Sequence, residues 1–247
     1  MSMPDPAIRF DRGDGLHLAL RMTGGAAPAI LFLPGYASAM TGGKATALDA
    51  WARRTGRAML RLDYSGCGES DGRFADGTLA RWRDDVLAVI DACEGEVVLV
   101  GSSMGGWLAL LVALARPDRV RGIVGVAAAP DFTAWGYTED EKLAILRDGR
   151  LQKPSPYGGT EIVTKGFWQS AEALRLTHAE IAVDCPVRLL HGESDAEVPP
   201  WLATRIAERV RSADVRTILV KGGDHRLSRG ADLALLVRTV AELVEGL

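Results

Sequence analysis

Two segments of the chain place a serine between glycines in the pattern G-x-S-x-G. One is Gly101-Ser102-Ser103-Met104-Gly105, and the other is Gly68-Glu69-Ser70-Asp71-Gly72. A serine hydroxyl attacks a carbonyl carbon efficiently only when the fold holds it on a sharp turn, where the start of a helix supplies amide donors and a partial positive charge. The pattern therefore indicates nucleophilic acyl transfer, and the flanking residues must decide between the two serines.

The first segment has the surroundings that this chemistry needs. A predicted strand at 96–100 leads into it, and an apolar helical pattern follows it directly. We therefore predict Ser103 as the nucleophile, with Ser102 as the less favoured neighbour. The alternative is that Ser103 only caps the helix. Ser70 lies between two carboxylates that would oppose formation of an alkoxide, so we interpret its loop as a turn.

A serine nucleophile needs an adjacent base, and four histidines are available, at positions 17, 178, 191 and 225. His225 follows the late apolar run 215–220 on a loop and precedes the last helical pattern. Ligands of open parallel sheets bind beyond the carboxyl ends of the strands, which favours this position. We predict His225 as the general base and interpret His191 as a structural residue at the end of a strand.

The third member of such a site is a carboxylate that holds the histidine in one tautomer and stabilises its protonated form. It should lie between the serine and the histidine in chain order. Asp195 fits best, because its loop follows the apolar run 187–190 at the same sheet edge. Glu193 and Asp224 compete for this role, although Asp224 adjoins the histidine in the chain and would reach its ring awkwardly.

Acyl transfer also needs two amide donors for the developing oxyanion. The N–H of Met104, directly after the nucleophile, is the first candidate. The second is the N–H of Tyr36, in the loop after the early apolar run 29–33, where Gly35 allows a close approach of the chain. The alternative is that this loop is an ordinary turn.

Short apolar runs alternate with amphipathic helical patterns along almost the whole chain, which is typical of a mostly parallel sheet with helices on both faces. An alternating hairpin pattern at 7–22 precedes runs at 29–33, 58–62, 97–100, 122–126, 187–190 and 215–220. Helical spacing occurs at 79–93, with Thr78 as the N-cap and a polar face of Arg81, Arg83, Asp84 and Asp85, and again at 233–243. We predict one α/β domain over residues 1–247 with about eight strands.

Residues 131–183 interrupt this alternation between two core strands. The segment is long and rich in Gly, Pro, Tyr and Trp. A connection of this length inside a compact fold is usually functional, so we predict an inserted lid above the site. Four of its aromatic side chains are candidates for the substrate wall, although core packing would explain them equally well: Trp135, Tyr137, Phe167 and Trp168.

Composition argues against several function classes. The 247 residues carry 29 Lys and Arg against 32 Asp and Glu, a net charge of −3, which gives no basic field for nucleic acid. No apolar run reaches the roughly 20 residues of a membrane span, and the first residues lack a signal or transit pattern, so we expect a cytoplasmic protein. The glycines at 66–72 and 42–44 fail as nucleotide-binding loops, and no metal-ligand pattern occurs, so no metal or other cofactor is expected.

Several segments together carry a family resemblance. They are Leu33-Pro34-Gly35-Tyr36, Gly43-Lys44-Ala45, Asp63-Tyr64-Ser65-Gly66, Arg81-Trp82-Arg83-Asp84-Asp85-Val86, Gly101-Ser102-Ser103-Met104-Gly105-Gly106-Trp107, Cys185-Pro186-Val187-Arg188-Leu189-Leu190-His191-Gly192 and Asp224-His225-Arg226. With the order Ser103, Asp195, His225, the chain resembles the α/β-hydrolase superfamily over nearly its whole length. More narrowly, it resembles the mitochondrial palmitoyl-protein thioesterases that also act as acyl-glucuronide esterases. The resemblance implies the α/β-hydrolase fold, the same three residues as nucleophile, acid and base, and a lid at the inserted segment. The chain departs from that family in showing no transit peptide.

These observations lead us to expect a cofactor-free serine hydrolase of the acyl-protein thioesterase or acyl-glucuronide esterase type. Its substrate would be a small-molecule ester or thioester, or an acylated protein, cleaved through an acyl-enzyme. A thiol with a pKa of about 8.5 leaves without much protonation, so esters and thioesters are favoured over amides. The alternatives are a general carboxylesterase or lactonase, and a non-catalytic receptor for a small ligand on the same fold. Acyl chain length and oligomeric state are left open.

Overall fold

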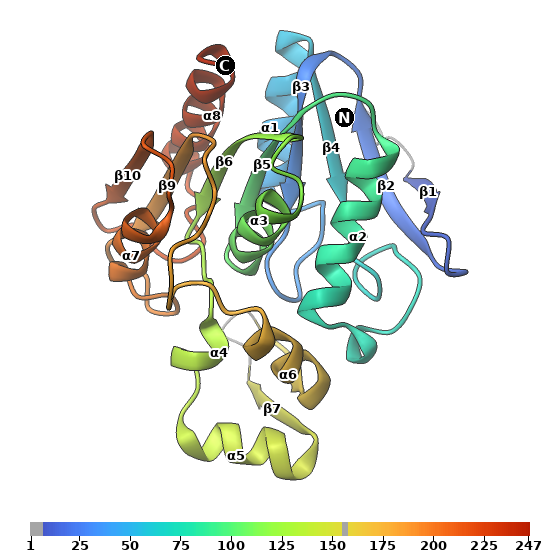
Figure 1. The fold of residues 1–247 in the computed structure, drawn as a ribbon, viewed down its shortest axis with the longest axis vertical. Helices are drawn as coiled ribbons and strands as arrows, with labels where there is room; N and C mark the ends of the chain where they lie inside the picture. The colour runs from blue at the N-terminus through green and yellow to red at the C-terminus, as the bar shows by residue number, and fades with distance from the viewer. Residues whose placement is uncertain (1–6, 155–157) are drawn as a thin grey trace.

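The computed structural model describes residues 7–154 and 158–247. Its main sheet has eight strands in the order β1-β2-β4-β3-β5-β6-β9-β10 (Figure 1). The strands are β1 (Ile8–Asp11), β2 (His17–Thr23), β3 (Ala26–Leu33), β4 (Arg57–Leu62), β5 (Val97–Ser102), β6 (Val120–Val126), β9 (Val187–Gly192) and β10 (Val215–Val220). The β1–β2 and β2–β4 pairs are antiparallel and the other pairs are parallel, which confirms the predicted fold class.

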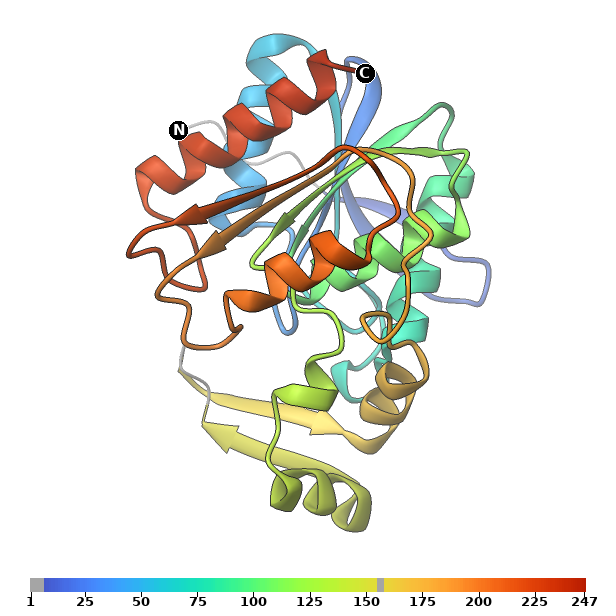
Figure 2. The ribbon, with the colours of Figure 1, turned by 60° about the vertical axis from the view of Figure 1, so that its left-hand side comes forward.

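Helices cover both faces of the sheet. One face carries α1 (Gly43–Thr55) and α8 (Gly230–Glu245), and the other carries α2 (Leu79–Ala92), α3 (Met104–Ala115) and α7 (Trp201–Arg209) (Figures 1 and 2). Successive strand side chains point to opposite faces, so Ile30 packs on the α1–α8 side while Leu31 packs on the other. A strand buried on both faces is apolar at most positions, which explains the nearly continuous apolar runs in the sequence.

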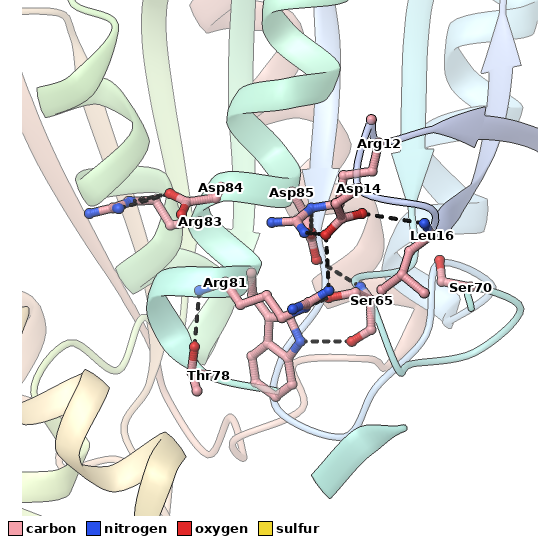
Figure 3. Close-up of polar contacts among 12 residues, drawn as sticks. Arg12, Asp14, Leu16, Ser65, Ser70, Thr78, Arg81, Arg83, Asp84 and Asp85 are labelled. Atoms are coloured by element: carbon pink, nitrogen blue, oxygen red, sulfur yellow. Dashed lines mark hydrogen bonds and ion pairs between the residues drawn. The ribbon is translucent and has the colours of Figure 1, made fainter. Parts of the chain in front are cut away.

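Helix α2 begins where the sequence predicts, but one residue of its expected polar face is buried. The Thr78 hydroxyl accepts a hydrogen bond from the Arg81 N–H at 3.1 Å and caps the helix. Asp85, by contrast, is fully buried, where it accepts from the Ser65 N–H at 2.7 Å and pairs with Arg12 at 2.6 Å (Figure 3). The ion pair and the amide replace water around this carboxylate. These two contacts link α2 to the β1–β2 turn and to the loop after β4.

The connection from β6 to β9, residues 127–186, is called the inserted segment below. It contains α4 (Phe132–Trp135), α5 (Glu139–Asp148), β7 (Arg150–Pro154), β8 (Thr160–Thr164) and α6 (Lys165–Ala173). Strands β7 and β8 form an antiparallel hairpin separate from the main sheet. Figure 2 shows the segment beyond the carboxyl ends of the parallel strands. The short helix η1 (Phe74–Asp76) lies in the loop between β4 and α2, and β8 contacts it.

Candidate active site

Ser103 occupies the sharp turn between β5 and α3. Strand β5 ends one residue before it and α3 begins one residue after it. Its backbone has φ 54° and ψ −119°, a conformation that costs a non-glycine residue free energy and recurs at functional sites. The Ser103 N–H donates to the Val126 carbonyl at 2.9 Å, and its own carbonyl accepts from the Ala129 N–H at 3.1 Å. The neighbouring strand therefore holds the strained turn in place.

Gly105 allows this turn to form against the end of β3. A Cβ atom at this position would lie 2.1 Å from the Leu33 carbonyl oxygen and 2.7 Å from that of Pro34. Both atoms belong to the backbone and have little freedom to move. The second glycine of the serine motif is therefore required by the close approach of α3 to the loop after β3.

Ser70, the serine of the second G-x-S-x-G segment, is engaged in backbone contacts. Its hydroxyl donates to the Asp63 carbonyl at 2.6 Å and accepts from the Ala19 N–H at 2.8 Å. These bonds hold the loop against β2. The interpretation of this segment as a turn is confirmed.

Asp195 and His225 are in direct contact at the carboxyl ends of β9 and β10. The Nδ1 atom of His225 lies 2.9 Å from Oδ2 of the buried Asp195. The other oxygen, Oδ1, accepts from the N–H groups of Glu197 and Val198 at 2.9 and 2.8 Å. Burial raises the pKa of Asp195, but hydrogen bonds from His191, His225 and Val198 outweigh it and hold the pKa below its usual range. The carboxylate is therefore charged at neutral pH and can stabilise a protonated imidazole.

The competing carboxylates do not contact the His225 ring in the same way. Asp224 accepts from the Leu227 N–H at 2.9 Å and so caps the turn that carries the histidine. Glu193 is exposed. Of the other histidines, His17 contacts Asp71 at 3.2 Å and His178 is exposed, both away from Asp195 in the fold.

Ser103 and His225 line a single cavity of about 1040 Å³. Its walls come from the loop after β3, the start of α1, the inserted segment and the loops after β9 and β10. The loops at the strand ends supply the serine and the histidine, and the inserted segment adds aromatic side chains as well as polar ones. The cavity therefore brings together a hydroxyl, an imidazole and an apolar wall.

The two predicted oxyanion donors lie beside Ser103, the predicted nucleophile. Within residues 7–154 and 158–247, the N–H groups of Tyr36 and Met104 donate to no protein acceptor. A Cβ atom at Gly35 would lie 3.4 Å from the Ser103 Cβ, so the loop after β3 passes close to the serine as expected. The Tyr36 hydroxyl donates to the Ile162 carbonyl at 2.6 Å, which links this loop to the β7–β8 hairpin.

The four predicted aromatic wall residues divide into two groups. Trp135 and Tyr137 line the cavity, whereas Phe167 and Trp168 are not among its lining residues, which corrects their assignment. Helix α6 turns Phe167 into an aromatic cluster, 4.8 Å from the Tyr36 ring and 5.5 Å from the Trp82 ring, measured between centroids. Trp168 packs against the core beside it. Phe132, which was not predicted as a wall residue, lines the cavity instead.

Charged side chains also line this cavity, although the sequence did not indicate that they belong to it. Lys44, at the start of α1, donates to the Arg226 carbonyl. Burial, aided by the nearby Arg226 guanidinium, lowers the pKa of Lys44 to about 8. Burial also raises the pKa of the cavity residue Glu161. The cavity lining therefore contains ionisable groups as well as apolar surface.

A family model described as "Alpha/beta hydrolase family" matches residues 30–235. The chain belongs to the alpha/beta hydrolase family. Individual relatives support this family assignment and confirm the predicted resemblance to the palmitoyl-protein thioesterases. The human mitochondrial palmitoyl-protein thioesterase ABHD10 is 42% identical over 244 residues, which cover 96% of this chain and 80% of the relative. The mouse protein of the same name is 42% identical over 245 residues, covering 96% and 82%.

Solved structures agree with this family assignment. The alpha/beta hydrolase domain-containing protein 10 from mouse superimposes with a TM-score of 0.91 at 40% identity, covering 97% of this chain and 98% of the other. A putative hydrolase from Agrobacterium vitis S4 gives a TM-score of 0.89 at 35% identity, covering 96% and 97%.

The comparisons also correct one expectation about this hydrolase. A cytoplasmic location was predicted, but the relatives that match it over nearly its whole length are named as mitochondrial proteins, so the prediction is wrong. Among the described residues, no helix is both long enough and apolar enough to cross a membrane. The same residues contain no group of three His, Cys, Asp or Glu side chains that could hold a metal ion.

Proposed function

We propose that this chain is a serine hydrolase that cleaves thioesters and carboxylic esters through an acyl-enzyme. The observation that carries the proposal is the 2.9 Å contact between His225 and the buried carboxylate of Asp195, at a cavity also lined by Ser103. Because Nδ1 of His225 faces Asp195, its Nε2 is free to act on the serine. The hydroxyl then donates its proton to the ring, and the carboxylate orients the ring and stabilises its protonated form, as in serine hydrolases.

The first half of the reaction acylates Ser103. Its Oγ bonds to the substrate carbonyl carbon while its proton passes to Nε2 of His225, and the Asp195 charge stabilises the resulting imidazolium. The carbonyl oxygen becomes an oxyanion that accepts from the N–H groups of Tyr36 and Met104. When the intermediate collapses, the bond to the thiol or alcohol breaks, and His225 returns its proton to the leaving group.

The second half releases the acid. Water gives a proton to His225 and attacks the acyl carbon, and the same two amides hold the second oxyanion. Collapse breaks the bond to Oγ, which recovers its proton. A thiolate is a weak base and departs with little proton transfer, so the arrangement suits thioesters at least as well as oxygen esters.

Long acyl chains are the substrate class that the cavity supports best. Its volume of about 1040 Å³ is at the top of the roughly 300–1,000 Å³ range for small-molecule sites. Phe132, Trp135 and Tyr137 supply an apolar wall. The thioesterase names of the relatives agree with this assignment. We extend the proposal to palmitoyl thioesters, with the acyl group against the aromatic wall.

A fluorophosphonate probe, which reacts with activated serines, tests the proposal. Wild-type protein should be labelled, and Ser103→Ala should abolish labelling. Ser102→Ala, the neighbouring hydroxyl, is the matched control and should be labelled. A wild-type protein that resists the probe would favour a non-catalytic receptor and refute the proposal. Hydrolysis of acyl thioesters of increasing length, against oxygen esters and acyl glucuronides, then ranks the substrate classes. A preference for short oxygen esters would indicate a general carboxylesterase instead.

A further inference from the structure

A second histidine contacts the carboxylate that holds His225. His191, near the end of β9, is 1% exposed. Its Nε2 lies 3.2 Å from Oδ2 of Asp195 and 3.0 Å from the Val198 carbonyl oxygen. Oδ2 is the same atom that His225 contacts through Nδ1. One carboxylate oxygen is therefore shared by two imidazole rings.

The surroundings of His191 fix its tautomer. A peptide carbonyl and a charged carboxylate can only accept hydrogen bonds, so Nε2 of His191 must carry a proton to contact both. The Asp195 carboxylate is the charged group facing this nitrogen, and His225 is the other ionisable ring on that carboxylate. The neighbour of His191 on β10 is the apolar Leu219, and β6, on the other side of β9, contributes the apolar Val126 opposite Leu190.

We propose that His191 is a positioning residue of the catalytic site, acting on His225 through Asp195; this inference rests on the proposed function. Its Nε2–H holds Oδ2 at the point where His225 must meet it. The same N–H ties the carboxylate to the Val198 carbonyl, and the Val198 N–H donates to Oδ1. Asp195 is therefore held from both of its oxygens, which restricts rotation of the carboxylate.

Sharing Oδ2 also weakens the electrostatic stabilisation that Asp195 gives to a protonated His225 ring. A carboxylate oxygen that accepts a second hydrogen bond carries less negative charge toward the first donor, and so stabilises an imidazolium less. Without the His191 donor, the acidic midpoint of the kcat/KM profile should move upward by roughly half to one pH unit.

Two substitutions separate this role from simple packing. His191→Gln places an amide N–H near the position of Nε2, whereas His191→Met is of similar size and has no donor. With a p-nitrophenyl ester between pH 5 and 9, we expect the acidic midpoint to rise in His191→Met and to remain near the wild-type value in His191→Gln. A folded His191→Met protein with the wild-type midpoint would overturn the proposal, even if its kcat were lower.

A measurement without turnover keeps the test decisive if the variants do not fold or the wild type does not hydrolyse esters. Nitrogen NMR of ¹⁵N-histidine-labelled Ser103→Ala protein reports the tautomer of each ring. We expect His191 to be protonated on Nε2 throughout the neutral range. A His191 ring protonated only on Nδ1 would refute the inference. Failure of the fluorophosphonate labelling would refute the proposed function alone, since the NMR result does not depend on activity.

Discussion

The substitution Gly105→Ala would disturb both proposed oxyanion donors at once. The added Cβ would lie 2.1 Å from the Leu33 carbonyl oxygen, whereas a carbon atom and a carbonyl oxygen in contact are at least about 3.3 Å apart. The start of α3 and the loop after β3 must therefore separate by about 1 Å. Met104 begins that helix and Tyr36 lies in that loop, so their two N–H groups would move apart.

The displacement should reduce catalysis more than stability. A misplacement of about 1 Å can cost about 100-fold in rate, and loss of one oxyanion donor costs about 10²–10³. We expect kcat/KM to fall at least 100-fold, with a loss of about 1–3 kcal/mol in the free energy of unfolding from the overpacked contact. The assays are ester hydrolysis and thermal unfolding followed by circular dichroism.

Gly166→Ala is the matched control for this experiment. Gly166 lies in α6, and a Cβ there would meet only a Thr78 methyl group at 4.0 Å. Alanine has the higher helix propensity, so this variant should keep its activity and gain up to about 1 kcal/mol of stability. A Gly105→Ala protein that retains most of the wild-type kcat/KM would show that the spacing between these two segments does not control the reaction.

Three further predictions concern single side chains. Ser70→Ala should be labelled by the fluorophosphonate like the wild type but lose about 1–3 kcal/mol in the free energy of unfolding, because the buried partners of its hydroxyl lose their hydrogen bonds; wild-type stability in chemical denaturation would contradict this. The depressed pKa of Asp195 means that its charge stabilises the fold above the unfolded-state pKa near 4 and that this contribution is lost as the pH falls through the folded-state value. The difference in unfolding free energy between wild type and Asp195→Asn should therefore shrink from about pH 5 downward, and a constant difference would argue against the assignment. Because the pKa of Lys44 is about 8, this cavity residue is charged below that pH and neutral above it. The KM of an ester with an anionic leaving group should rise between pH 7 and 9 relative to a neutral ester, and Lys44→Met should remove that difference; if the variant keeps the same pH dependence, Lys44 is not its source.

The main sheet could be predicted because burial on both faces leaves a direct mark on the sequence. The buried positions of a central strand such as β5 are mostly apolar, and the chain shows this as the continuous run 97–100. Ser103 could be distinguished from Ser70 for the same reason, since only the first follows such a run and precedes a helix. These features depend on neighbours in the chain, which a sequence displays.

Contacts between distant segments could not be predicted in this way. Helical spacing assigns Asp85 to a polar face, yet its partner Arg12 comes from the β1–β2 turn, which is distant in the chain but next to β4 in the sheet. Phe167 and Trp135 are both aromatic residues of the inserted segment, and only their packing places one in the core and the other at the cavity. His191 was interpreted as structural because its residue type and position at a strand end do not reveal that its ring meets Asp195.

The inserted segment leaves and rejoins the sheet at adjacent strands. Strands β6 and β9 are hydrogen-bonded to one another, with Ile123 opposite Val187. The described residues between them, 127–154 and 158–186, therefore form a contiguous excursion that contributes no strand to the main sheet. Mutation, lengthening or wholesale replacement of this stretch can remodel the binding wall without changing the register of the strands beneath it. Changes confined to the inserted segment could therefore alter substrate preference and leave the proposed catalytic residues in place.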